Sequence, residues 1–442
     1  MLNINIPRIL PHEQVFSIQV GDSMFRLSGA SLSSDGPSYF TTFFKLQRKN
    51  DNKEYPTLYI DRSPDVFRDV VRHLQGYYVV PKDEYHFVYL YADAHYYQLP
   101  KLIKLLFSSE IFVRIGSIPF RVPRDLLKQP GDSPNFFTLG FSSFFASPEE
   151  VFPGTKGLLR PPSVAPPSVP LHSDVLFGQL IELLKGTPLK FDSPEHRDQL
   201  IKECRYYHFR GLEQKIIPAN LSFNSLTGQS EITVRIQDVK PQGVGTRVTD
   251  TTSVENTTRL LTYKRPFVDK DFRDLVLQVS SDEAVLRPYD VSYSESRVSA
   301  RWGVQIIQGS TTAAKLCLIF ETISDIAPTF KKLGALRLQA DLTDCFIEAD
   351  GKSVEVIVNT DGMVEFSIQG NVGPEEEGSK KRKLSDMTAA IEMAEGKLIP
   401  VNLAIVNAQF KIQVIGGRCV VHFVKIDAIR TTKFRNTIRN FL

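Results

Sequence analysis

The sequence contains few cysteines, which argues against a disulfide-rich secreted scaffold. Its 442 residues include four, far apart in the chain: Cys204, Cys317, Cys345 and Cys419. The N-terminus has no basic start followed by an apolar core, which is the pattern of a secretory signal. A long chain with few, scattered cysteines and no such signal is typical of an intracellular protein with reduced thiols. The sequence therefore predicts location in the cytoplasm, the nucleus or both.

Long apolar runs and an excess of one charge are also missing. No run approaches the ~20 apolar residues of a membrane helix, so we expect no membrane span. The formal net charge is only +3, which argues against a protein coated in basic residues for binding nucleic acid. The length suffices for about three domains of ~150 residues each.

The sequence also lacks the motifs of common enzymes. It contains no Gly-x-x-x-x-Gly-Lys-Ser/Thr loop, no Gly-x-Gly-x-x-Gly, no His-Glu-x-x-His and no Gly-x-Ser-x-Gly. We therefore predict no catalytic residues, no cofactor and no enzymatic activity. An unrecognised enzyme in the second half of the chain stays open as an alternative.

The chain does contain an internal repeat. Residues 16–27 return as residues 111–122, and Gly21, Phe25 and Arg26 match Gly116, Phe120 and Arg121. The match continues through four further pairs of segments: 36–40 with 133–137, 43–44 with 144–145, 74–76 with 184–186, and 96–97 with 206–207. Two similar modules side by side indicate an architecture that presents surfaces to partners.

The first copy has clear signals for secondary structure. Two β-prone runs, Val15–Val20 and Met24–Leu27, flank Gly21-Asp22 and predict a hairpin. Ser63-Pro64 is a favourable helix start, and Gly76 is a favourable end. Apolar residues between them fall on one helical face: Val66, Phe67, Val70, Val71 and Leu74.

The second copy and the rest of the chain differ from this pattern. A Pro-rich insertion over residues 161–170 predicts an exposed extended loop. From residue 219 the runs are β-rich, including Leu316–Phe320, and predict a β-domain over 219–442 of about ten strands, a sandwich or a barrel. Residues 371–383 are predicted to form a flexible loop within it.

The first copy resembles a BTB/POZ domain of the potassium-channel tetramerisation type, especially those of fungal proteins. The residues that carry the resemblance are, in order, Ile60-Asp61-Arg62, Asp65-Val66-Phe67, His73-Leu74-Gln75-Gly76 and Asp93-Ala94-His95-Tyr96-Tyr97-Gln98-Leu99. It covers residues 12–107 well and 110–217 more weakly, because no Ile-Asp-Arg element is recognisable there. The expected fold class is α+β: two tandem BTB/POZ-like α/β modules, then a predominantly β C-terminal domain.

The resemblance implies an interaction domain without catalysis. Members of this family self-associate and recruit proteins, among them cullin ligase scaffolds, phosphatases and transcription factors. Channel members hold zinc between subunits with a His/Cys cluster, and no such set ends the first module here. The implied partners are proteins, with self-association through the modules or an internal pseudo-dimer, and no bound metal.

Two groups of residues are candidate interaction or targeting sites. In one interpretation, Asp61 and Arg62 form a charged pair at an intersubunit surface. In the other, they form only the turn that starts a helix, where an aspartate is favourable near the helix N-terminus. The tetrad Lys380-Lys381-Arg382-Lys383 fits a nuclear-import signal or a solvated loop, and lacks the aromatic residues typical of nucleic-acid binding. Cys204 and His208 have metal-like spacing, but zinc needs three or four ligands, so we expect Cys204 to pack in the core.

The leading hypothesis is a non-enzymatic intracellular scaffold that binds proteins through BTB/POZ domains. Two further alternatives remain at this stage: a substrate adaptor for a cullin-type ubiquitin ligase, and a nuclear transcription-associated regulator.

Overall fold

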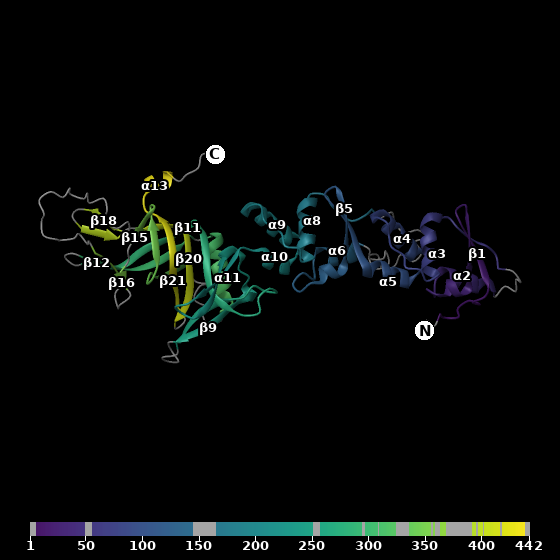
Figure 1. The fold of residues 1–442 in the computed structure, drawn as a ribbon, viewed down its shortest axis with the longest axis horizontal. Coiled ribbons are helices and arrows are strands. Elements are labelled where there is room, and N and C mark those ends of the chain that lie inside the picture. Colours follow the sequence, from purple (N-terminus) through teal and green to yellow (C-terminus); the bar gives the residue numbers. More distant parts are fainter. Residues whose placement is uncertain are drawn as a thin grey trace. The chain divides into compact units, whose positions relative to one another are not determined.

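The chain forms two compact units, Met1–Glu213 and Gln214–Leu442, which are described separately (Figure 1). The computed structural model describes residues 6–48, 55–144, 165–250, 257–293, 297–307, 309–323, 336–354, 357–358, 363–367, 391–394, 397–400, 402–415 and 418–437. None of the described helices is both long and apolar enough to cross a membrane.

The first module of unit 1, residues 12–107, is a small sheet covered by helices. Its strands are β1 (Val15–Val20), β2 (Ser23–Ser28) and β3 (Leu58–Ile60), in the order β2-β1-β3. β1 is antiparallel to β2, as the predicted hairpin requires, and parallel to β3. The helices are α1 (Gly29–Ser33), α2 (Tyr39–Arg48), α3 (Pro64–Leu74), α4 (Glu84–Tyr96) and α5 (Pro100–Ser109).

Helix α3 confirms its sequence signals. Ser63 is its N-cap residue and Pro64 occupies the first turn, where the missing N–H of proline costs nothing. Gly76 follows the helix with φ +89°, a conformation that glycine adopts without a Cβ clash. The face that the spacing predicted is buried through Val66, Phe67, Val70 and Leu74.

The second module, residues 110–217, forms a sheet with the same order and strand directions, and its last four residues fall beyond the boundary of unit 1 at Glu213. Its strands are β4 (Glu110–Ile115), β5 (Ile118–Pro123) and β6 (Ser168–Val169), in the order β5-β4-β6. The helices are η1 (Arg124–Lys128), α6 (Phe136–Phe144), α8 (Asp174–Leu184), α9 (Pro194–Tyr207) and α10 (Arg210–Ile216).

The predicted exposed loop over 161–170 is wrong at its C-terminal end. Residues 161–164 lie outside the described residues, but Ser168–Val169 form the edge strand β6 beside β4. β4 and its turn donate hydrogen bonds from Arg114 N to Pro167 O and from Gly116 N to Val169 O. The Pro-rich segment therefore supplies carbonyl oxygens, which proline retains, and an edge strand tolerates the missing N–H.

The aromatic cores of the two modules match closely. The ring centroids of Phe40 and Tyr97 lie 4.9 Å apart, and those of Phe137 and Tyr207 lie 5.0 Å apart. A buried aspartate ties the loop before the first of these rings to a late helix in each module. Asp35 accepts the backbone N–H groups of Lys101 and Leu102, and Asp132 accepts that of Leu212.

Within unit 1 the two modules touch through α4 and β4. The Phe87 ring on α4 stacks on the Phe112 ring of β4 with centroids 5.1 Å apart, and Glu84 forms an ion pair with Arg114. One module contributes a helix and the other contributes a strand. The contact is therefore head-to-tail rather than two-fold symmetric.

Unit 2 contains a barrel, one of the two predicted arrangements. Strands β11, β12, β13, β21 and β20 pair in a closed ring, in which only β13 and β21 are parallel. The strands of this unit are β7 (Ala219–Asn224), β8 (Gln229–Arg235), β9 (Val244–Asp250), β10 (Thr258–Tyr263), β11 (Arg273–Tyr293), β12 (Arg297–Ile306), β13 (Leu336–Asp341), β14 (Phe346–Ala349), β15 (Lys352–Val354), β16 (Ile357–Val358), β17 (Val364–Ser367), β18 (Ile391–Ala394), β19 (Lys397–Pro400), β20 (Leu403–Ile415) and β21 (Arg418–Ile429). The helices are η2 (Ile236–Asp238), η3 (Pro241–Gly243), α11 (Thr311–Glu321) and α13 (Thr432–Thr437).

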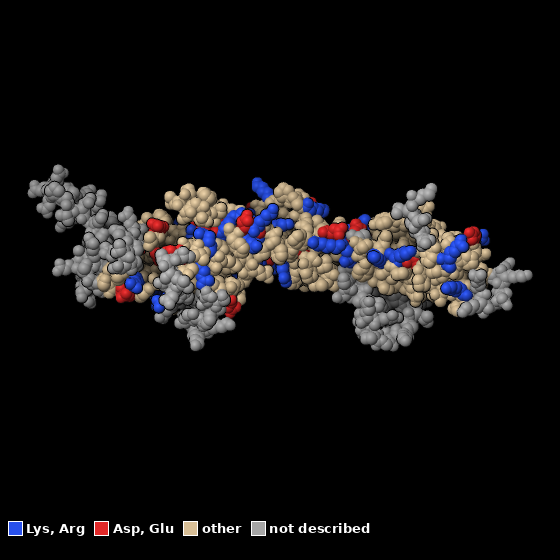
Figure 2. Space-filling model, turned by 90° about the horizontal axis from the view of Figure 1, so that it is seen from below, with Lys and Arg blue, Asp and Glu red and all other residues tan. Residues whose placement is uncertain are grey.

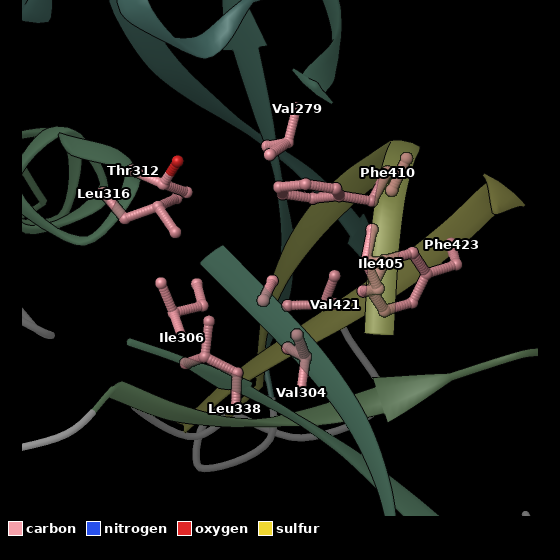
Figure 3. A pocket seen from close by; sticks show the side chains of 12 residues that line it. Val279, Val304, Ile306, Thr312, Leu316, Leu338, Ile405, Phe410, Val421 and Phe423 are labelled. Carbon is pink, nitrogen blue, oxygen red and sulfur yellow. The ribbon is translucent and has the colours of Figure 1, made fainter. Parts of the chain in front are cut away.

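The barrel interior is apolar and almost filled. Side chains from its strands, among them Val304, Leu338 and Phe410, converge on the centre, and α11 adds Thr312 and Leu316 (Figure 3). The free space between them is about 10 Å³, on the order of a single water position. This interior is a packed core rather than a ligand chamber.

The prediction of a strand at Leu316–Phe320 is wrong, because these residues belong to α11. The helix begins at Thr311, five residues before this apolar segment. Ser310 caps it by accepting a hydrogen bond from Ala313 N. A short apolar run alone does not distinguish a buried helix from a strand.

Candidate interaction surface

The predicted residues Asp61 and Arg62 lie between β3 and α3. β3 ends at the buried Ile60, and the chain turns here to begin α3 at Pro64. The Asp61 side chain is exposed, whereas Arg62 reaches across to α4. There its Nε lies 2.5 Å from Oδ1 of Asp93. The charged pair is therefore Arg62–Asp93, and the sequence prediction missed the second partner.

Asp93 is a buried carboxylate with one oxygen in use. The residue is 4% exposed, and its Oδ2 has no hydrogen-bond partner among the described residues. Burial raises the pKa of the Asp93 carboxyl, and the Arg62 guanidinium opposes that effect. A buried acceptor without a donor is costly, so this oxygen favours any donor that can reach it.

The Arg62 guanidinium also packs on an aromatic ring. Its Cζ lies 4.7 Å from the ring centroid of Tyr96 on α4, within the range of a cation–π contact. The ring centroid of Tyr39 lies 5.8 Å from that of Tyr96. Arg62 is thus fixed by a carboxylate and a ring together.

A cleft of about 350 Å³ opens beside this pair. Its lining comes from the β3–α3 turn, from the first turn of α3 and from α4: Asp61, Arg62, Ser63, Val66, Tyr89, Ala92 and Asp93. Both predicted site residues therefore line a hollow that a side chain of another molecule can enter.

Exposed tyrosines extend the same face of α4. Tyr85 and Tyr89, one helical turn apart, are 50% and 54% exposed, and Ala92 and Tyr96 continue the row by helical spacing. Tyr77 and Tyr78, which precede α4, are also exposed. Tyrosine and arginine are enriched at protein interfaces and among the residues that dominate binding.

The second module carries a changed version of the same arrangement. His172 directly precedes the N-cap residue of α8 as Arg62 directly precedes that of α3, and its Nδ1 lies 2.9 Å from Oε2 of Glu203 on α9. The His172 ring stacks on that of Tyr206, with centroids 3.7 Å apart. Val169 is the counterpart of Ile60, since each accepts the N–H of the glycine in the preceding hairpin turn, and the segment between strand and helix is one residue longer in the second module. His172 thus takes the place of Arg62, which sequence comparison alone did not reveal because both the residue type and the spacing from the strand differ.

The tyrosine row is not repeated on α9. The register that places Glu203 and Tyr206 opposite Asp93 and Tyr96 places Glu195, Gln199 and Lys202 opposite Tyr85, Tyr89 and Ala92. These three residues are exposed and polar, as on an ordinary solvated helix face. The row of exposed tyrosines is therefore specific to the first module.

The remaining sequence candidates contribute nothing to this surface. Lys380, Lys381, Arg382 and Lys383 lie outside the described residues, as does the loop 371–383. Cys204 is fully buried in the second module, where burial raises the pKa of its thiol, so the expected core packing is confirmed. On the described part of the face in Figure 2, basic side chains form no continuous stripe.

Comparisons with known proteins agree with this architecture. Residues 16–106 match the family model of the BTB/POZ domain, and residues 229–437 match a model described as the YLR108C C-terminal domain. The first module is therefore a BTB/POZ domain of the potassium-channel tetramerisation type, and a protein-interaction role follows from that class.

Two proteins of Saccharomyces cerevisiae are similar to the chain. It is 36% identical over 331 residues to "Uncharacterized protein YDR132C", covering 64% of this chain and 66% of that protein. It is 40% identical over 239 residues to "BTB/POZ domain-containing protein YLR108C", covering 54% of this chain and 48% of that protein. The matches thus span less than two thirds of either relative.

Proposed function

We propose that this protein is a non-enzymatic scaffold that binds other proteins through the α4 face of its BTB/POZ domain. The observation that carries the proposal is the exposed pair Tyr85 and Tyr89 beside the Arg62–Asp93 cleft. Aromatic residues around a fixed arginine provide a large contact area at a small cost in side-chain entropy. The equivalent face of α9 in the second module is polar. Exposed tyrosines are therefore not a feature that both modules share at this helix.

We further propose that residues 110–217 are a second, diverged BTB/POZ-like repeat and that the two modules form an internal pair. The shared strand order and the matching Phe–Tyr stacks support the repeat. The contact of Phe87 with Phe112 supports the pair. In this arrangement part of the surface available for self-association is already occupied within one chain.

Unit 2 favours a structural role over an enzymatic one. Its apolar barrel is packed, and burial raises the pKa of the Cys345 thiol to about 12, which leaves it a poor nucleophile at neutral pH. We propose that this unit presents or stabilises the binding module.

The cullin-adaptor and nuclear-regulator roles remain narrower proposals for the same binding module. Binding of the purified chain to a purified cullin scaffold would favour the adaptor role. Replacement of Lys380–Lys383 by alanine tests the nuclear role, since import through this tetrad predicts loss of nuclear signal. Unchanged location would remove the tetrad from the proposal.

The test of the scaffold proposal compares two faces of unit 1. The double variant Tyr85→Ser/Tyr89→Ser should lose the proteins that the wild-type chain captures from an extract. The matched variant Glu195→Ser/Gln199→Ser, on the equivalent face of α9, should retain them. Equal capture by all three chains would contradict the α4 face as the binding surface.

A further inference from the structure

We propose that β7, an edge strand of unit 2, binds an extended segment of a partner protein as one additional strand. The segment is uncharged, and its side chains on the face of Leu221 and Phe223 are apolar. This inference goes beyond the proposed function, because it concerns unit 2 and needs neither Tyr85 nor Tyr89. It rests on the outer backbone groups of β7, on its exposed side chains and on its lack of charge.

The outer edge of β7 offers backbone hydrogen bonds. The strand lies at one end of its sheet and pairs only with β8 among the described residues. Alternate residues of such a strand direct their N–H and C=O groups away from the neighbouring strand, and none of the residues 219–224 is a proline. Within the described parts of the chain these outer groups have no other backbone partner. A second extended backbone matches such a row of donors and acceptors.

The β7–β8 hairpin holds this edge in place before any partner arrives. The two strands pair in one uninterrupted register, without a bulge. At the turn, Oδ1 of Asn224 accepts the N–H of Leu226 at 3.0 Å, and its Nδ2 donates to Oε1 of Glu231 at 2.9 Å. Glu231 in turn forms an ion pair with Lys411 of β20 at 2.6 Å. A strand that is already ordered lowers the entropic cost of binding.

Two side chains of β7 continue the buried face of the sheet past its edge. Leu221 stands directly opposite Ile232 of β8, and opposed residues of antiparallel strands lie on the same face. Ile232 is fully buried, whereas Leu221 and Phe223 are 47% and 66% exposed. Leu226, in the turn that follows, is also exposed. Apolar side chains at alternate positions of an added strand would cover this surface, and removing it from water favours the pairing.

The edge also lacks the protection that natural edge strands usually have. Residues 219–230 contain no charged side chain, although charge, shortness or a bulge commonly keeps an edge from pairing. Other described edges of the same sheet have such features. β16 has only two residues, and β9 carries Arg247 and has a register shift in its pairing with β10. β7 is therefore suited to pairing with an uncharged strand, and the association should not depend on salt.

A segment of a partner protein fits this edge better than a second copy of the chain does. A two-fold pairing of β7 with itself, centred on Ser222, would align Leu221 with Phe223 of the other copy. Only these two side chains of each copy would then meet on the apolar face. That is a small area beside the ~800 Å² per partner of a standard interface. A segment of another protein is not restricted by symmetry and can also contact Leu226.

The experiment measures hydrogen exchange of the backbone N–H groups of residues 219–224 in the full chain by mass spectrometry. The probe is the peptide acetyl-Thr-Val-Thr-Val-Thr-Val-amide with N-methyl groups on its threonines, which leaves the valine N–H groups free to pair along one edge. The control is the same peptide with every residue N-methylated, which keeps the side chains and removes these donors. We expect the probe to slow exchange over 219–224 saturably, at low and high salt alike, and the control to leave it unchanged. Exchange over residues 244–250 of β9 should not respond to either peptide.

Paired surface variants test the edge itself. Phe223→Lys places a charge on an exposed side chain of β7 and should weaken probe binding at least about tenfold. Val248→Lys makes a similar change at an exposed position of β9 and should bind as the wild type does. Unchanged exchange, equal slowing by both peptides, or full binding by the Phe223→Lys chain would overturn the inference. A dimer that is lost with Phe223→Lys would also overturn it, because a second copy would then occupy the edge.

The outcome is separable from that of the scaffold proposal. The Tyr85→Ser/Tyr89→Ser chain should bind the peptide as the wild type does, so failure of the peptide test would leave the α4 face as proposed. In the capture test, a protein held by β7 is recognised because it is lost with Phe223→Lys and retained by the tyrosine variant.

Discussion

Arg62 Nε and Asp93 Oδ1 lie 2.5 Å apart, although the two residues are separated by 30 others along the chain. The contact joins the end of β3 to α4 and sets the position of Arg62 on the proposed binding face. It uses one of the two carboxylate oxygens of Asp93, a residue that also lines the cleft. The stability of the first module and the chemistry of its surface therefore depend on the same carboxylate.

Replacing Arg62 with methionine should destabilise unit 1. The variant leaves the Asp93 carboxylate buried without its cation, and breaking a buried ion pair costs about 3 kcal/mol. The loss should shrink as the pH falls, because burial already raises the pKa of Asp93 and protonation removes the uncompensated charge.

Urea unfolding followed by circular dichroism of the helices of unit 1 measures this effect. Trp302 is the single tryptophan and lies in β12 of unit 2, so its fluorescence serves as an internal control that should not change. The double variant Arg62→Met/Asp93→Leu should recover most of the loss. An Arg62→Met chain as stable as the wild type would show that the pair does not hold β3 against α4.

Asp341 should make unit 2 sensitive to acid. Burial alone would raise the pKa of its carboxyl, but hydrogen bonds from His422 and Thr343 lower that pKa to about 2. A carboxyl whose folded-state pKa is depressed stabilises the fold above its ordinary pKa of ~3.9, and that stability is lost as the pH falls toward 2. Since the side chain is 29% exposed, we expect Asp341→Asn to cost about 1–2 kcal/mol at neutral pH.

Trp302 fluorescence during urea unfolding reports this loss directly. The difference between wild type and Asp341→Asn should narrow between pH 4 and pH 2. Asp427→Asn, which changes an exposed contact with Asn407 between β20 and β21, is the control and should have little effect. A difference that stays constant with pH would rule out the depressed pKa as its cause.

The chain should be a monomer of 49.9 kDa by light scattering. A head-to-tail contact between modules would build rings or filaments if α9 of one copy could receive β1 of the next. The residues that make the internal contact are not repeated there: Pro194 and Arg197 stand in place of Glu84 and Phe87, and Ser17 and Gln19 stand in place of Phe112 and Arg114. A dimer or tetramer that is lost with Tyr85→Ser/Tyr89→Ser would contradict this and show that α4 pairs with another copy.

Much of unit 1 is predictable from sequence because its signals are local. Gly21 at the turn and Ser63-Pro64 at the helix start act through backbone geometry alone, and the structure confirms the elements they mark. β6 escapes prediction because its role depends on β4, more than fifty residues earlier, which uses the carbonyl oxygens of a Pro-rich segment.

The proposed binding site is only partly predictable for a similar reason. Asp61 and Arg62 stand out in a motif, but the partner of Arg62 lies on another element. One signal could have revealed it: Asp93 and Glu203 occupy equivalent places before the paired tyrosines of both modules, so an acid recurs there. The difference between Tyr89 and Gln199 becomes meaningful only once the helices are aligned in space.

The capture experiment tests the central claim most directly. Wild-type chain, Tyr85→Ser/Tyr89→Ser and Glu195→Ser/Gln199→Ser are used at equal concentration, and the bound proteins are quantified. We predict that the tyrosine variant loses the proteins that the wild type and the α9 variant both retain. Retention of the same proteins by a folded tyrosine variant would contradict protein binding through the α4 face.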